Sequence, residues 1–241
     1  MAFTDQGRRL TAGHRAAQAR IGAETARQMS ELWVLLNTEA RSLSVNQWVE
    51  ACLIVLGHRF DLSAGTARAY YTAFRLAEIG EAGFAARQVP TLPLDATRAS
   101  LIAKGPARFA AARRRGLAVS EASRLARVEA ARESIRIALD GGRQQIVLSS
   151  GEDDEAVGWA RVTDGSPCAF CAMLASRGPV YKTRRTSHFS AHASCGCSAE
   201  PFFSRQQPWP PGAREFKELW NVSTAGERDQ LNAFRRAYEG R

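Results

Sequence analysis

Long apolar runs are missing from this sequence. No stretch of about 18 or more consecutive apolar residues occurs, although 45% of the 241 residues are hydrophobic, so no membrane-spanning helix is expected. The first ten residues, MAFTDQGRRL, become polar at once and lack the apolar stretch of a secretory signal. We therefore expect a chain that builds its own core, makes no contact with a membrane and is made and kept in the cytoplasm.

Catalytic signatures are also missing. The sequence has four histidines, and neither an HExxH nor a GxSxG motif occurs. His14 and His58 each stand alone, without a sequence partner that would make them catalytic. The chain is therefore not expected to be an enzyme, and no catalytic residue is predicted.

Positive charge is concentrated in the first part of the chain. The net charge is +9, and residues 1–150 hold 21 basic and 13 acidic side chains, against 12 and 11 in residues 151–241. The stretch 87–143 contains 12 basic and 5 acidic residues. Nucleic acid or an acidic protein surface is a suitable neighbour for such a stretch. A solvated helix face explains it equally, because few aromatic residues for base stacking are interleaved.

The N-terminal region, residues 1–88, is predicted to be helical. Its apolar residues recur every three or four positions, as in an amphipathic helix packed on a core; the first helix shows this at Ile21, Thr25, Met29, Leu32 and Leu36. Ser44 and Ser63 are candidate caps that would begin a second and a third helix. Cys52 falls on the apolar face of the second helix and is predicted to be a core residue.

A second helical region is predicted over residues 94–148. Two prolines in the segment 89–93 prevent helix there, so this segment is expected to be a linker. Gly105-Pro106 should break the region into shorter helices, and Gly141-Gly142 should end its last helix. The short apolar run 146–148 is then predicted to be a strand.

The composition changes at about residue 149. Residues 149–207 hold four of the five cysteines among Pro, Gly, Ser and His, and this segment is predicted to be a loop-rich module with short strands. Residues 208–241 recover helical periodicity, with Thr224 and Glu227 as a candidate capping box. The predicted fold class is therefore mainly α: an N-terminal bundle of long helices, a small zinc-stapled module and C-terminal helices.

The cysteines and one histidine form a pattern typical of a metal site. Two pairs, CAFC and CGC, are separated by 23 residues, and a histidine precedes the second pair; the candidate ligands are Cys168, Cys171, His192, Cys195 and Cys197. A CxxC turn can aim two sulfurs at one ion, and a second pair completes a tetrahedron. Five candidates compete for four positions, because a CxC pair is strained as a clamp. His188 is a spare candidate.

Zinc is the metal that such a mixed set of cysteine and histidine suits best. With four protein ligands the site would be closed, and therefore structural, and it would stabilise a segment that has few bulky apolar residues. Disulfides between the same cysteines are an alternative, against which the expected cytoplasmic location counts. A redox CxxC is another, but no strand-to-helix setting that would lower a thiol pKa is evident.

The residues around the cysteines also resemble a known family. The stretch 158–181, GWARVTDGSPCAFCAMLASRGPVY, followed by HASCGC at 192–197, resembles minor capsid proteins of tailed phages that infect actinobacteria. It is more distantly similar to Mu F-like head morphogenesis proteins, whose pattern is an acidic residue, a CxxC and a later HxxCxC. The C-terminal LNAFRRAYE is similar to the same actinophage family. Ser166-Pro167 before the first cysteine departs from the usual Mu F-like form.

This resemblance implies a structural minor capsid or head morphogenesis protein. Its expected partners are the portal protein, the major capsid protein and, without sequence preference, packaged double-stranded DNA. Its expected place is the inner side of the capsid near the portal, after assembly in the host cytoplasm. Two rival functions are a capsid maturation protease, since members of such families sometimes carry that label, and a DNA-binding packaging accessory protein.

Overall fold

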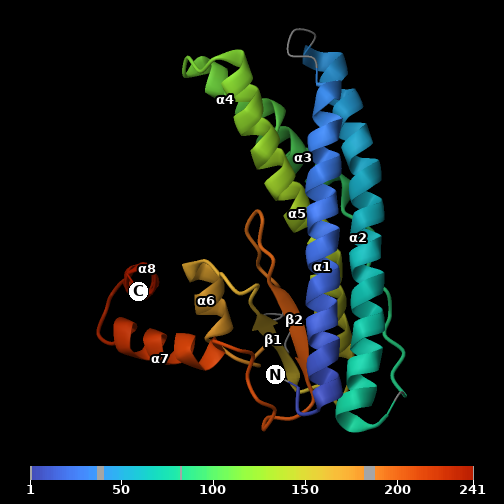
Figure 1. Cartoon of the computed structure of the whole chain (residues 1–241), viewed down its shortest axis with the longest axis vertical. Helices are drawn as coiled ribbons and strands as arrows, with labels where there is room; N and C mark the ends of the chain where they lie inside the picture. Colours follow the sequence, from blue (N-terminus) through green and yellow to red (C-terminus); the bar gives the residue numbers. More distant parts are fainter. Residues whose placement is uncertain (1, 37–40, 82, 182–187, 241) are drawn as a thin grey trace.

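Three long helices form the body of the protein (Figure 1). The computed structural model describes residues 2–36, 41–81, 83–181 and 188–240. Helices α1 (Asp5–Leu32), α2 (Arg41–Ile79) and α5 (Val119–Glu152) pack against one another, and a 3₁₀ turn, η1 (Trp33–Leu35), extends α1. The prediction of a mainly α fold with a small strand-containing module and C-terminal helices is confirmed.

Helix α2 is one continuous helix, whereas the sequence predicted two. Its buried apolar residues recur every three or four positions without a break, at Trp48, Cys52, Leu56, Phe60, Ala64, Ala67, Tyr71 and Phe74. Because this stripe never changes phase, tertiary packing carries the helix past both candidate caps. Ser44 and Ser63 therefore lie inside α2, and their prediction as helix starts was wrong. The prediction of Cys52 as a core residue is confirmed.

Ser63 instead joins the three long helices. Its hydroxyl donates to Gln18 Oε1 of α1 at 2.7 Å and accepts from the amide of Gly142 in α5 at 2.9 Å. The Gln18 side-chain amide donates back to the Ser63 carbonyl at 3.1 Å. Gln18 and Ser63 are both buried, so each of these groups would be costly to leave unpaired. This polar contact fixes the register of the bundle.

Helix α5 runs straight through Gly141 and Gly142, which were predicted to end it. At this point α5 crosses α2, and a Cβ atom on Gly141 would overlap the backbone oxygen of Phe60. A Cβ atom on Gly142 would lie 2.7 Å from Ser63 Oγ. The two glycines therefore permit a close helix crossing and do not terminate the helix. The run 146–148 lies in α5 as well, so the predicted strand was wrong.

Two short helices connect α2 to α5. The expected linker has no regular structure, and the break at Gly105-Pro106 separates α3 (Leu94–Lys104) from α4 (Pro106–Arg114), as predicted. Gln145 of α5 holds the linker in place: its side chain donates to the carbonyl of Arg87 at 2.7 Å and accepts from the amide of Val89 at 3.1 Å. The positively charged region thus lies largely on α3, α4 and the first half of α5.

The module beside the bundle is built on one antiparallel strand pair. Strands β1 (Gly158–Val162) and β2 (Ser198–Phe202) pair from Gly158 opposite Phe202 to Val162 opposite Ser198, with the short helix α6 (Ala169–Ala175) between them in sequence. Helices α7 (Ala213–Thr224) and α8 (Gln230–Glu239) pack on α6 at the outer side (Figure 1). Thr224 ends α7, and Asp229 caps α8, so the predicted Thr224–Glu227 capping box was wrong.

None of the described helices is both long enough and apolar enough to cross a bilayer.

His14 makes the stability of the bundle depend on pH. It is buried and stacked on Tyr70 with 4.4 Å between ring centroids, and its Nδ1 atom has no hydrogen-bond partner among the described residues. Burial lowers the pKa of His14 from 6.5 to about 4. Between these values the unfolded chain binds the proton and the folded chain does not, so the free energy of unfolding decreases as pH falls from 6.5 towards 4.

His14→Phe is expected to keep the stacking and to remove this dependence, which is worth about 3 kcal/mol. Urea unfolding of wild type and variant at pH 7 and pH 4.5 measures it. Other titrating groups contribute equally to both proteins and cancel in the comparison. An equal loss of stability in the two proteins on acidification would contradict the assignment.

Candidate metal centre

The strand pair brings the two halves of the cysteine pattern together. Cys168 is the N-cap of α6, which follows β1, and Cys171 lies in the first turn of that helix. Cys195 and Cys197 lie in the loop that runs directly into β2. Since the end of β1 pairs with the start of β2, the segments that carry the four cysteines meet at one end of the strand pair. A separation of 23 residues in sequence thus becomes a contact in space.

The side-chain atoms of the five predicted ligands form two overlapping groups. Cys168, Cys171 and His192 make one, and Cys171, Cys195 and Cys197 make the other; within each group the ligand atoms lie within 4.8 Å of one another. The Sγ atoms of Cys171 and Cys195 are 3.6 Å apart. Tetrahedral zinc with bonds of about 2.3 Å to sulfur places two sulfurs roughly 3.8 Å apart. The separation of these two sulfurs therefore suits a tetrahedral ion. Each group offers three donors, with Cys171 common to both, and a fourth ligand would come from the other group.

His192 presents the correct nitrogen to this cluster. Its Nε2 atom lies 3.0 Å from Cys168 Sγ and 3.5 Å from Cys171 Sγ. Its Nδ1 atom lies 2.8 Å from the carbonyl oxygen of Ala193, which can only accept, so Nδ1 carries the hydrogen. The lone pair is then on Nε2, which is the arrangement found when a histidine binds a metal and its other nitrogen is held by a backbone carbonyl.

Burial of the thiols differs across the cluster. Cys171, Cys195 and Cys197 are buried, whereas Cys168 and His192 are exposed at its outer edge. The thiol hydrogen bonds from Cys171 and Cys197 lower the pKa of Cys195 well below its usual range. Metal ions bind thiolates and not thiols. The same cluster raises the pKa of Cys171 and of Cys197, so a bound cation would be needed to hold further thiolates there.

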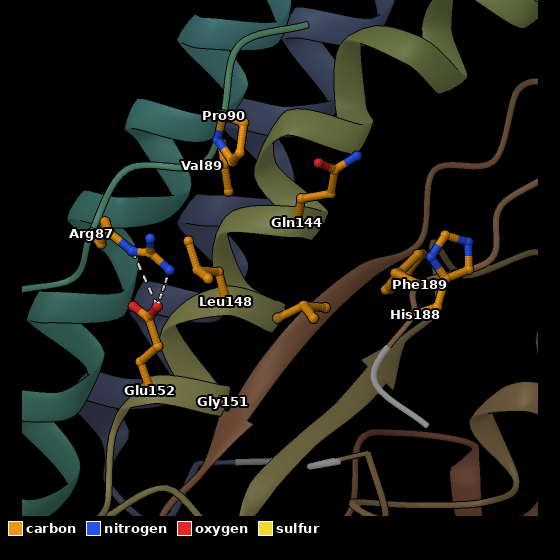
Figure 2. Close-up of a pocket in the computed structure, with 10 residues that line it drawn as sticks. Arg87, Val89, Pro90, Gln144, Leu148, Gly151, Glu152, His188 and Phe189 are labelled. Atoms are coloured by element: carbon orange, nitrogen blue, oxygen red, sulfur yellow. Dashed lines mark hydrogen bonds and ion pairs between the residues drawn. The ribbon is translucent and has the colours of Figure 1, made fainter. Parts of the chain in front are cut away.

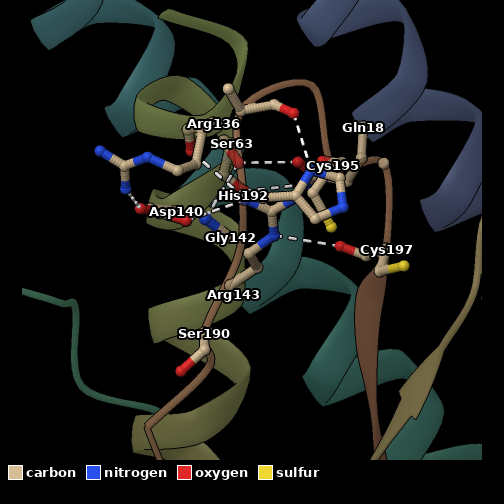
Figure 3. A network of polar contacts seen from close by, with 12 residues as sticks. Gln18, Ser63, Arg136, Asp140, Gly142, Arg143, Ser190, His192, Cys195 and Cys197 are labelled. Atoms are coloured by element: carbon tan, nitrogen blue, oxygen red, sulfur yellow. Dashed lines mark hydrogen bonds and ion pairs between the residues drawn. The ribbon is translucent and has the colours of Figure 1, made fainter. Parts of the chain in front are cut away.

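The ligand loop, residues 192–197, is hydrogen-bonded to the long helix α5. Arg143 donates from Nε to the carbonyl of Cys197 at 3.0 Å, and its Nη2 atom donates to the carbonyl of Cys195 (Figure 3). The same guanidinium is paired with Asp140 at 2.9 Å. Ser194, in the left-handed region with a φ of 64°, donates its amide to the carbonyl of Arg132. Hydrogen bonds thus attach the Cys/His cluster to the bundle through α5.

The spare candidate, His188, belongs to neither group of candidate ligands found in the described part of the chain. Figure 2 shows it with Phe189 across a groove of about 620 Å³ from α5. The groove is also lined by Leu148 and by Arg87 and Glu152, which form an ion pair with each other. His188 is therefore not part of the donor set that the structure assembles.

The geometry bears on two alternatives to a metal site, which are disulfides between the cysteines and a redox CxxC pair. None of the five cysteines is joined in a disulfide. The strand-to-helix setting that was not evident in the sequence does exist, because Cys168 caps a helix that follows a strand. The partners of the CxxC pair are nevertheless a histidine and two further cysteines, which is a metal-binding set and not an isolated redox pair.

Two arginines beside the cluster could not be inferred from local sequence patterns. Arg143 holds the ligand loop, and Arg161 on β1 points its Nη1 atom at the sulfurs of Cys171 and Cys195, 3.7 and 3.9 Å away. Their distances in sequence from these cysteines range from 10 to 54 residues. No local spacing rule connects them with the ligands, so only the strand pairing and the packing on α5 reveal their roles.

Comparison with protein families adds an independent observation. The family model described as VG15 protein matches residues 6–222, which is most of the chain. The chain belongs to the VG15 protein family. This is a family of phage gene products, so the protein is a phage protein. The VG15 match begins in α1 and ends in α7, and it therefore includes both the helical bundle and all five candidate ligands.

No curated protein and no solved structure matches the chain.

Proposed function

We propose that this VG15-family chain is a structural minor component of a tailed-phage head, bound to the portal protein on the inner side of the capsid. The observation that carries the structural role is the donor set: five protein side chains gather at one point of a module in a phage-family chain. Four of them would fill a tetrahedral shell around one ion, which would leave no position for a reacting water. The site therefore serves folding and not catalysis.

Zinc is the ion that we propose for this shell. Four thiolates, or three thiolates with an imidazole, suit zinc, and the sulfur separation of 3.6 Å agrees with its tetrahedral bond lengths. The ion would supply what the module lacks, because one two-stranded ladder of five residues per strand is marginal alone. Cys168, Cys171, His192, Cys195 and Cys197 are the residues from which its four ligands come.

The basic surface supports the proposed location and a second candidate function. Residues 101–132 hold eight basic and two acidic side chains, a net of +6 out of the +9 of the chain. None of these eight basic side chains forms an ion pair with a residue that the structure describes. Unpaired positive charge on α3, α4 and the start of α5 suits packaged DNA.

The second candidate is therefore a DNA-binding packaging accessory protein without sequence preference. Its affinity for duplex DNA should fall steeply as salt rises from about 50 to about 200 mM, because bound counterions are released. Fluorescence anisotropy with duplexes of unrelated sequence tests this. Binding that is insensitive to salt would count against it.

The proposed function is tested by co-expression with the phage portal and major capsid proteins. The chain is expected to co-purify with portal rings and to appear in mature virions as a band much weaker than that of the major capsid protein. The mass of the major capsid protein is expected to be unchanged by co-expression. Absence from both portal rings and virions would refute the structural role, and a trimmed capsid protein would favour the rival protease.

A further inference from the structure

Arg161 is the most deeply buried arginine of the described chain, and it lacks a carboxylate. It is 2% exposed, compared with 3% for Arg143 and 5% for Arg75. Arg143 is paired with Asp140 and Arg75 with Asp153, each at 2.9 Å. No described carboxylate forms an ion pair with Arg161. A buried guanidinium with no negative partner is unfavourable, so a counter-charge of another kind is required.

The groups around Arg161 identify that counter-charge. Its Nη2 atom donates to the carbonyl of Ser190 at 2.5 Å, and its guanidinium carbon lies 3.9 Å above the Phe189 ring. These contacts orient the side chain and leave Nη1 facing the sulfurs of Cys171 and Cys195. A sulfur keeps its negative charge when it binds a metal as a thiolate. The two cysteine sulfurs are thus the partners that can neutralise Arg161.

We propose that Arg161 is the counter-charge of the metal centre, and that the four ligands are Cys168, Cys171, His192 and Cys195, with Cys197 outside the coordination shell. This proposal rests on the metal centre proposed above and assigns its ligands and a positioning residue.

Charge balance supports this ligand set. A divalent ion with three thiolates and a neutral imidazole has a net charge of −1, which Arg161 balances. Four thiolates would give −2 and leave one buried negative charge without a partner, because the other nearby guanidinium, Arg143, is already paired with Asp140. Removing charges from water is favourable only where they are neutralised and hydrogen-bonded. The set with one histidine meets this condition.

The contacts between donor atoms support the same set. His192 Nε2 lies 3.0 Å from Cys168 Sγ and 3.5 Å from Cys171 Sγ. Cys171 Sγ in turn lies 3.6 Å from Cys195 Sγ, so these contacts link all four proposed ligands. Cys197 directly precedes β2, and its carbonyl is held by Arg143. Only one residue separates Cys195 from Cys197, so they are poorly spaced to bind one ion together. Arg161 Nη1 faces Cys195 and Cys171. The Cys197 sulfur lies within 4.8 Å of both sulfurs, and in this ligand set it stays a neutral thiol beside the bound ion.

The role of Arg161 is tested by Arg161→Met and Arg161→Lys in the full chain, with zinc affinity measured by competition against a chromogenic chelator. Arg161→Met is expected to weaken zinc binding about 10- to 100-fold, as is typical for groups that support metal ligands. Arg161→Lys keeps the charge and should recover part of the loss. The control is Arg132→Met, an exposed arginine near the ligand loop, which should change affinity less than about two-fold.

Thermal melting separates a counter-charge from ordinary packing. In chelator, where no ion is bound and fewer thiolates face Arg161, Arg161→Met is expected to lose little or no melting temperature relative to wild type. In zinc it should melt below wild type. A variant that melts lower by the same amount in both conditions, or binds zinc as tightly as wild type, would overturn the role of Arg161.

The ligand set is tested by single substitutions in cobalt-loaded protein. Cys197→Ser is expected to retain one cobalt ion and the full sulfur-to-cobalt charge-transfer absorption, whereas Cys195→Ser loses it. Loss of cobalt from Cys197→Ser with retention by His192→Ala would overturn the assignment. If wild type binds neither zinc nor cobalt, the metal centre itself is refuted, which is a different outcome from failure of the Arg161 variants.

Discussion

Cys171→Ser is expected to abolish metal binding and to unfold the module while most of the bundle stays folded. Cys171 belongs to both donor groups, so its loss leaves only two donors in each group. The coupled folding energy of a structural zinc is roughly 10 kcal/mol or more, which exceeds what the five-residue strand pair can supply. The apolar cluster around Trp48 and Leu56 contains none of the metal ligands and should keep α1, α2 and α5 associated.

Hydrogen exchange measures this difference directly. The amide of Val157, which donates to Phe202, and the amides of β1 should lose protection in Cys171→Ser, while amides in the middle of α2 remain protected. Cys52→Ala is the matched control, because Cys52 is a buried cysteine of the bundle core outside the metal cluster. This control should keep a full complement of metal. Retention of metal and of strand protection by Cys171→Ser would contradict the structural role of the cluster.

Gly141→Ala is expected to destabilise the bundle by about 2 to 3 kcal/mol, although alanine is the better helix former. Its added methyl group would overlap the backbone oxygen of Phe60, and backbone atoms cannot move aside as a flexible side chain can. The helices α2 and α5 must then separate at their crossing, which also stretches the hydrogen bond from Gly142 to Ser63. Urea unfolding followed by circular dichroism measures the loss.

Gly151→Ala in the same helix provides the control. Gly151 is exposed, and a Cβ atom there meets nothing within 4 Å. Alanine should therefore stabilise α5 by about 0.5 kcal/mol through its intrinsic preference for helix. The two substitutions are chemically identical and should have opposite signs. If both variants are stabilised, Gly141 is not at a close helix crossing.

The features predicted correctly from sequence are those that local pattern determines. Periodic apolar residues gave the long helices, Gly105-Pro106 gave the break between α3 and α4, and cysteine spacing gave a cluster that the fold does bring together. Each of these signals lies within one helix, turn or motif. The helices and the candidate metal ligands can therefore be predicted from local sequence patterns, without the tertiary structure.

The errors arose where a residue serves a distant partner. Gly142 and Ser63 have the chemistry of a helix stop and a helix cap, yet they meet at the crossing of α2 and α5. The hydrogen bond between them joins residues that are 79 positions apart in the sequence. Arg161 lies in the short strand β1, which contains no acidic residue. Its role depends on the sulfurs of Cys171 in α6 and Cys195 in the ligand loop. Long-range pairing of this kind is not encoded in any local spacing.

Native mass spectrometry of the full chain, purified without added chelator, tests the central claim most directly. We expect one zinc ion per chain, lost together with the protection of β1 when a strong chelator is added. A metal-free mass of the folded chain would contradict it. So would a mass lowered by two hydrogens per cysteine pair, which would show that the cluster is held by disulfides and not by a metal.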